Sequence, residues 1–175
     1  VTRSDIAKER IYLCGASFGA ITGSTAAAFE PRIRATVLTY GGGNRPTLLA
    51  SDVTKKQLGM WTRPVTYLGA YLFSPSDPIH YVKMISPRPV LFQSGTHDTV
   101  VPPESGRLLY EAAGEPKEIT WYDSDHIGLD HDTVIKVLAD SVAWLKKQDA
   151  SVVHANPGTT RMSAVNAGSA FSLLN

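Results

Sequence analysis

The chain has 175 residues, of which 43% are hydrophobic and 19% are charged, and it carries a formal net charge of +1 at pH 7. This length and composition are sufficient for one globular domain with a buried core. Because basic and acidic residues nearly balance and no basic block occurs, there is no electrostatic basis for binding nucleic acid or an anionic membrane. The single cysteine, Cys14, excludes an internal disulfide and a thiolate metal cluster, and it is expected to be a small buried side chain of a strand.

Strands and helices are predicted to alternate along the first half of the chain. The apolar run 10–15 indicates a buried strand, the small-residue run 19–29 indicates a helix packed closely on a sheet, and residues 33–40 indicate a second strand. Residues 44–82 show a weaker pattern, which favours short helices and loops. The aromatic side chains of this region are predicted to pack in the interior, and the alternative is that part of them line the acyl pocket; they are Trp61, Tyr67, Tyr71 and Phe73.

The second half continues the alternation. Residues 89–95 indicate a third strand, residues 103–113 a helix that Gly114 would cap, and residues 118–122 a fourth strand. Apolar residues at helical spacing over 132–147 predict a final amphipathic helix. Such alternation is typical of an α/β fold in which a parallel sheet is flanked by helices.

The two ends of the chain are less informative. Residues 1–5 lack the apolar run of a secretory signal peptide, and no run of about 18 apolar residues occurs anywhere. The domain is expected to span residues 1–150, and the small and polar residues of 151–175 predict a flexible tail. The cellular location is not fixed by the sequence, and a cytoplasmic one is the default expectation.

A candidate nucleophile lies between the first predicted strand and the first predicted helix. Gly15-Ala16-Ser17-Phe18-Gly19 matches the pattern G-x-S-x-G. In a tight strand-to-helix turn the serine adopts a strained conformation, and small neighbours such as Gly15 and Gly19 allow the backbones to approach. The start of the helix also favours negative charge developing beside Ser17. Alone the match is moderate evidence, because a serine between glycines also occurs in ordinary loops.

Two further residues strengthen that interpretation. Asp98 directly follows the third predicted strand, and His126 directly follows the fourth. The carboxyl ends of parallel strands meet at one edge of a sheet, which is where ligands bind in such folds. The chain order Ser, Asp, His is the order expected when the serine sits at a strand-to-helix turn. We therefore predict a Ser17–His126–Asp98 catalytic triad.

Each residue of the predicted triad also has a simpler structural interpretation. Ser17 and His126 also fit ordinary loop positions, and Asp98 also fits a turn or helix cap before the prolines that follow it. The polar residues near His126 suggest a metal site less than they suggest turns and the start of the last helix; they are Asp123, Asp125, Asp130, His131 and Asp132. No metal site is predicted. His97 is expected at the surface or beside the site.

The segment from Ile11 to Gly19, the Gly95–Pro102 segment and the His126 loop together resemble the C-terminal half of an α/β-hydrolase. Within that superfamily the sequence is most similar to dienelactone-hydrolase-like and prolyl-oligopeptidase-like esterases and peptidases. The resemblance implies Ser17 as nucleophile, Asp98 as acid and His126 as base, with the Phe18 backbone N–H as one oxyanion-hole donor. It implies no metal or organic cofactor. Dienelactone hydrolases usually carry cysteine as nucleophile, so serine here favours ester hydrolysis.

The position of Ser17 departs from the family pattern. The family sheet has eight strands, four of which precede the nucleophile, so the four predicted strands would correspond to strands 5–8. We therefore expect the chain to be the C-terminal portion of such a hydrolase, without the early loop that usually supplies a second oxyanion donor. Losing one donor typically costs about 10²–10³ in turnover. The strand near residues 10–15 would have an unpaired edge, and we expect it to pair with a second chain or a second copy.

The predicted function is hydrolysis of a small-molecule carboxylic ester through an acyl-enzyme, which makes the protein a serine carboxylesterase. Two alternatives stay open. One is a serine peptidase of the prolyl-oligopeptidase type, and the other is a truncated, inactive binding or assembly module. No nucleic-acid or membrane partner is expected.

Overall fold

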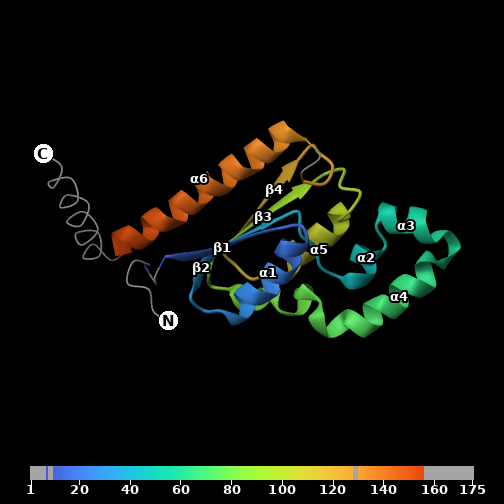
Figure 1. Ribbon diagram of the computed structural model, residues 1–175. Coiled ribbons are helices and arrows are strands. Elements are labelled where there is room, and N and C mark those ends of the chain that lie inside the picture. The colour runs from blue at the N-terminus through green and yellow to red at the C-terminus, as the bar shows by residue number, and fades with distance from the viewer. Residues whose placement is uncertain (1–6, 8–9, 128–129, 156–175) are drawn as a thin grey trace, which may run out of the picture.

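The computed structural model describes residue 7, residues 10–127 and residues 130–155. Its centre is one sheet of four parallel strands in the order β1-β2-β3-β4 (Figure 1). The strands are β1 Ile11–Ala16, β2 Ile33–Thr39, β3 Val90–Gly95 and β4 Lys117–Tyr122. The predicted parallel α/β sheet is therefore confirmed. In the described part of the chain β1 pairs only with β2, and the association of its other edge with another chain stays a prediction.

Helices cover both faces of the sheet (Figure 1). The α-helices are α1 Phe18–Phe29, α2 Arg45–Leu49, α3 Asp52–Leu58, α4 Thr62–Phe73, α5 Pro103–Ala112 and α6 His131–Ala155. Short 3₁₀ turns connect them: η1 Gly59–Trp61, η2 Ser74–Ser76, η3 Pro78–His80 and η4 Val82–Ile85. None of the described helices is both long and apolar enough to span a bilayer.

The core lies on both faces of the sheet because side chains of a strand alternate between the two faces. Val90 and Phe92 of β3 pack towards α1, η4 and α5, in one cluster with Leu109 of α5. Between them, Leu91 points to the opposite face, where it packs with Trp144 of α6. Both helix layers are therefore held to the sheet by buried apolar side chains, which provide most of the favourable free energy of folding.

A buried glutamine joins the strands near their carboxyl ends. The Gln93 side-chain oxygen accepts hydrogen bonds from Thr39 (2.7 Å) and Ser141 (2.9 Å). Its amide donates to the Tyr122 hydroxyl (2.8 Å) and to the Val137 carbonyl (3.0 Å). All four hydrogen-bonding positions of this inaccessible side chain are used, so β2, β3, β4 and α6 are connected where the candidate site begins.

Residues 45–73, comprising α2, α3, η1 and α4, form a helical extension that projects from the carboxyl ends of the strands (Figure 1). Asp77 ties the extension to the rest of the molecule. Its buried carboxylate accepts the backbone N–H groups of Asn44 (3.1 Å) and Arg45 (2.6 Å) at the start of α2, and that of Ile79 (3.1 Å) after the extension. One side chain thus caps two helical segments at the base of the extension.

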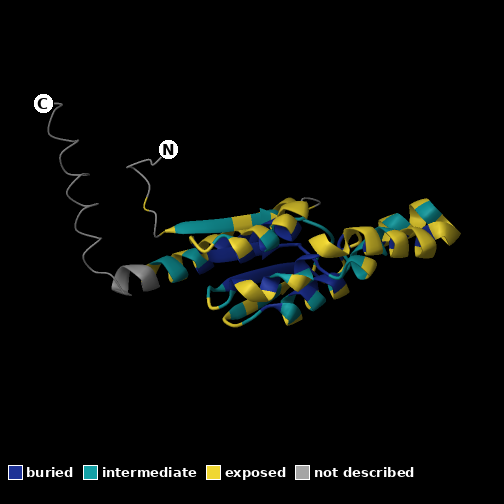
Figure 2. Cartoon of the chain, turned by 90° about the horizontal axis from the view of Figure 1, so that it is seen from below, coloured by how far each residue is buried: buried dark blue, intermediate teal, exposed yellow. Residues whose placement is uncertain are grey.

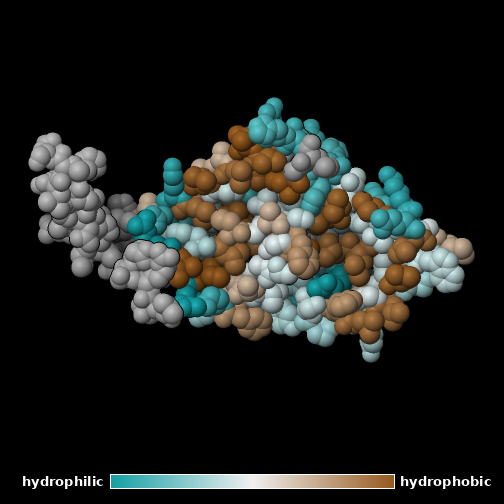
Figure 3. Space-filling view, in the orientation of Figure 1, coloured by the Kyte–Doolittle hydropathy of each residue, from teal (hydrophilic) through white to brown (hydrophobic). Residues whose placement is uncertain are grey.

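The outward face of α4 is apolar, which contradicts the prediction that the aromatic residues of this region pack in the interior. The buried residues of α4 are Thr62, Thr66 and Ala70, one turn apart, so its small side chains form the packing edge. Trp61, Tyr67, Tyr71 and Phe73 are all exposed. Figures 2 and 3 show the extension as largely exposed, with hydrophobic residues at its surface. The segment is rich in apolar residues, but α4 is buried along its edge of small side chains and not along its aromatic face.

Three further details differ from the sequence-based expectations. Cys14 is exposed, because β1 is an edge strand in the described part of the sheet. Gly114 is not a left-handed cap: α5 ends at Ala112, its C-cap residue Ala113 is extended, and a Cβ at Gly114 would lie 2.7 Å from the Ser86 Cβ. Finally, α6 continues past residue 150 to Ala155, while the rest of the predicted tail, residues 156–175, lies outside the described residues.

Candidate active site

Ser17 occupies a sharp turn between β1 and α1. Its backbone has φ 53° and ψ −121°, a region that residues other than glycine rarely adopt and that costs about 1–3 kcal/mol. The Ser17 N–H donates to the Thr39 carbonyl at 2.8 Å, which fixes the turn against β2. A Cβ on Gly15 would lie 2.3 Å from the Gly19 carbonyl oxygen, whereas a Cβ on Gly19 would meet no described atom within 4 Å. Of the two glycines, it is therefore Gly15 that must lack a side chain for this turn to form.

Asp98 follows β3 and is only 6% exposed. One carboxylate oxygen accepts the backbone N–H groups of Val100 (2.9 Å) and Val101 (2.7 Å). The other oxygen lies 2.7 Å from Nδ1 of His126. The turn interpretation and the triad interpretation of Asp98 are therefore compatible, because each uses a different oxygen of the same carboxylate.

His126 follows β4 and bridges the two other predicted residues. Its Nε2 lies 2.8 Å from the Ser17 hydroxyl oxygen. Because a carboxylate only accepts hydrogen bonds, Nδ1 donates to Asp98 and Nε2 remains the acceptor for the serine hydroxyl. The ring of Tyr40 packs edge-on against the imidazole, with 5.8 Å between centroids, and so limits its rotation. The structure thus brings Ser17, His126 and Asp98 together in one chain of hydrogen bonds.

Two further residues support this arrangement, and neither was assigned that role from the sequence. Asp125 accepts the backbone N–H groups of Thr99 (2.8 Å) and His126 (2.7 Å), and so connects the loop after β3 to the loop after β4. These backbone hydrogen bonds lower the pKa of the Asp125 carboxyl. Tyr40 has φ 51°, and its hydroxyl lies 2.6 Å from that of Ser124. Adjacency to the predicted triad residues is the only sequence signal for Asp125.

Three of the other acidic and histidine residues near the site, His97, Asp123 and Asp130, have structural partners. His97 Nε2 lies 2.9 Å from Asp123, and both side chains are exposed. Asp130 accepts the N–H of Thr133 at 2.8 Å, at the start of α6, as the helix-start interpretation predicts. Within residues 7, 10–127 and 130–155, no group of three or more His, Cys, Asp or Glu side chains is placed to hold a metal ion.

A cavity of about 710 Å³ lies between the helical extension and the loop after β3. The extension contributes Pro46, Ala50, Asp52, Lys55, Arg63 and Tyr67, among others, and the loop contributes Asp98, Pro102 and Pro103. Of the four aromatic residues considered in the sequence, Tyr67 lines this cavity. Since Asp98 lies in its wall and also bonds to His126, the cavity borders the candidate active site.

Comparison with known protein families identifies the family of the chain. Residues 1–151 match the sequence profile of the prolyl oligopeptidase family. The chain belongs to that family. No curated protein matches the sequence.

Solved structures share the fold of this family member. An α/β hydrolase from Penicillium sp. sh18 matches with a TM-score of 0.63 and 22% identity over 82% of this chain and 65% of its own. Acetyl xylan esterase 1 from Thermoanaerobacterium sp. JW/SL YS485 matches with a TM-score of 0.64 and 20% identity over 84% of this chain and 48% of its own. The acylaminoacyl peptidase of Pyrococcus horikoshii matches with a TM-score of 0.57 and 20% identity. That match covers 69% of this chain and 20% of the peptidase chain. The chain thus has part of the α/β-hydrolase fold and spans less than two thirds of the length of these relatives.

Proposed function

We propose that this chain is a serine hydrolase that cleaves small carboxylic esters through a covalent acyl-enzyme. The observation that carries the proposal is the hydrogen-bond chain from the Ser17 hydroxyl through the His126 imidazole to Asp98, with distances of 2.8 and 2.7 Å. Family membership supports a hydrolase of the esterase or peptidase kind. A serine hydroxyl is a weak nucleophile until an adjacent base accepts its proton, and His126 is in position to do so.

In the first half-reaction Ser17 Oγ attacks the ester carbonyl while its proton moves to His126 Nε2. Asp98 stabilises the imidazolium that forms and keeps the ring oriented. The negative charge on the carbonyl oxygen is stabilised by the backbone N–H of Phe18, at the first turn of α1, where helix N–H groups lack intrahelical partners. When the intermediate collapses, the bond to the alcohol breaks and His126 Nε2 returns the proton to the leaving oxygen.

In the second half-reaction a water molecule attacks the acyl-enzyme. His126 accepts a proton from the water and then donates it to Ser17 Oγ as the acyl–serine bond breaks. The products are the carboxylic acid and the alcohol, and the enzyme returns to its starting state. Every proton is carried by His126, so the proposed reaction proceeds without any cofactor.

A replacement of the nucleophile tests the proposal. Ser17→Ala is expected to lower kcat on a series of short-chain esters by about 10³-fold or more. Ser74→Ala is the matched control, because Ser74 is an exposed serine far along the chain in η2. A fluorophosphonate probe should label the unmodified chain and the Ser74→Ala variant but not Ser17→Ala. Full turnover by Ser17→Ala would contradict the role of Ser17. An unmodified chain that neither reacts with the probe nor cleaves esters would favour a binding or assembly module.

A serine peptidase is the second candidate, and the family match is the observation that favours it. Peptidases and esterases of this fold use the same groups but differ in the leaving group that they accept. Assaying aminoacyl-prolyl amides beside acyl esters of matched acyl groups separates the two. We expect kcat/KM to be higher for the ester, and a higher kcat/KM for the amide would favour the peptidase.

A further inference from the structure

The cavity beside the candidate active site is lined by both apolar and charged residues. Pro46, Ala50 and Pro103 contribute apolar surface. The charged groups are Asp52, Lys55 and Arg63 of the extension, together with Asp98. A cavity of about 710 Å³ with this composition has the size and the mixture of apolar and polar groups that small-molecule sites have.

The charged groups of the cavity are not equivalent. Lys55 Nζ lies 2.9 Å from Asp52, so these two charges balance each other. Asp98 is bonded to His126 and to two backbone N–H groups. The Arg63 guanidinium, in contrast, makes no hydrogen bond, ion pair or ring contact with the residues that the structure describes. The lining of the cavity therefore carries one positive charge without a partner in that part of the chain.

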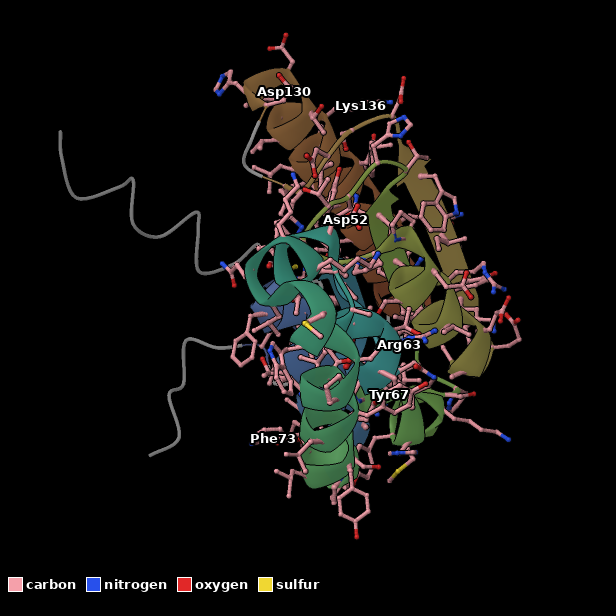
Figure 4. The ribbon with its side chains drawn as sticks, turned by 90° about the vertical axis from the view of Figure 1, so that its right-hand side faces the viewer. Asp52, Arg63, Tyr67, Phe73, Asp130 and Lys136 are labelled. Carbon is pink, nitrogen blue, oxygen red and sulfur yellow. The ribbon has the colours of Figure 1, made fainter. Side chains whose placement is uncertain are left out.

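Arg63 and Tyr67 lie one turn apart on α4 and both line the cavity (Figure 4). The opposite wall contains Asp98, and only the imidazole of His126 separates that carboxylate from the Ser17 hydroxyl. A molecule that fills the cavity therefore contacts the Arg63 guanidinium on the side of the extension. The candidate nucleophile lies beyond the opposite wall, which contains Asp98.

We propose that Arg63 binds a carboxylate of the substrate, so that the preferred esters are half-esters of dicarboxylic acids. This inference rests on the proposed function, because it names the class of ester that the same site accepts. A guanidinium suits this role, since its planar set of N–H groups donates two parallel hydrogen bonds to a carboxylate. The apolar residues of the lining accommodate the methylene chain between the carboxylate and the ester.

Direct binding tests the inference without depending on turnover. Monoethyl adipate and its neutral analogue ethyl hexanoate are titrated calorimetrically into the full chain carrying Ser17→Ala. We expect the half-ester to bind at least about tenfold more tightly than the neutral ester, as a charge-assisted hydrogen bond allows. Adding Arg63→Gln should abolish most of that preference, and adding Lys56→Gln should leave it unchanged, because Lys56 is an exposed cation of α3 that does not line the cavity. The preference should also weaken at high salt.

The outcomes separate the two proposals. Equal affinity for both esters, no measurable binding of either, or an unchanged preference in Arg63→Gln would overturn the role of Arg63. Arg63-dependent binding without Ser17-dependent hydrolysis would support the carboxylate site while contradicting the proposed function. Thermal melts check that each variant folds. Should Arg63→Gln not fold, Arg63→Lys keeps the charge but loses the paired donors, and it is expected to retain only part of the preference.

Discussion

The sheet region and the helical extension bury their apolar side chains to very different degrees. In the sheet region, Leu38, Phe92 and Leu109 are at most 3% exposed and pack in one cluster. In the extension, Met60 is 87% exposed and Tyr71 is 79% exposed, and α4 packs through small and polar residues (Figure 2). The sheet region therefore supplies the stability of the domain, while the extension supplies a cavity wall.

The same division applies to function. The proposed nucleophile, base and acid all follow strands of the sheet, where a connected core holds their positions. Arg63 and Tyr67, which line the cavity, come from the extension. If the sheet edge carries the chemistry and the extension carries recognition, as we propose, substrate preference can change without disturbing the reacting groups.

The largest expected effect concerns the sheet core. Leu109 of α5 is fully buried, so Leu109→Ala leaves a cavity and should lower the free energy of unfolding by about 2–5 kcal/mol. Urea denaturation at pH 7 measures this change. A loss below about 1 kcal/mol would mean that the core cluster does not carry the stability assigned to it.

The turn at Ser17 is the second place where packing is tight. Gly15→Ala would bring a methyl group against the Gly19 carbonyl, and we expect it to cost about 1–3 kcal/mol of stability. Displacement of the serine by about 1 Å should also reduce ester turnover by about 10²-fold. Gly19→Ala is the matched control for stability, because its Cβ meets nothing among the described atoms. Equal destabilisation by both substitutions would contradict the steric argument.

Removing the bridge made by Asp125 should lower the free energy of unfolding by an intermediate amount that depends on pH. Its pKa is lowered in the folded chain, so the ionised form stabilises the fold. That contribution is complete above the pKa of the unfolded chain, about 3.9, and is lost as the pH falls through the lower folded pKa. Asp125→Asn should therefore cost about 1 kcal/mol at pH 7, and denaturation curves should show this difference shrinking below about pH 4. A difference that stays constant with pH would exclude the carboxylate as its source.

The smallest expected effect lies on the extension. Leu68 of α4 is 61% exposed, so Leu68→Ala should change the free energy of unfolding by no more than about 0.5 kcal/mol. It is the matched counterpart of Leu109→Ala, since both replace a helical leucine by alanine. If the two variants lost similar stability in urea denaturation, the contrast between the two regions would be wrong.

Local patterns in the sequence determined the α/β class, the parallel sheet and the strand ends that carry Ser17, Asp98 and His126. These features depend on hydrophobic periodicity and on residue types next to strand ends, both of which are properties of short segments. The sequence also indicated a helical region over 44–82 but placed its aromatic residues in the interior, because an apolar composition does not reveal which helix face is buried.

Only the tertiary structure decided the contacts between segments that are distant in the sequence. Asp125 bridges two loops, Tyr40 packs on His126, and Arg63 faces a cavity whose other wall contains Asp98. None of these contacts follows from periodicity, since each depends on how separate elements are oriented around the sheet. The sequence therefore determined which groups meet at the sheet edge, and the packing of the extension against that edge decided what surrounds them.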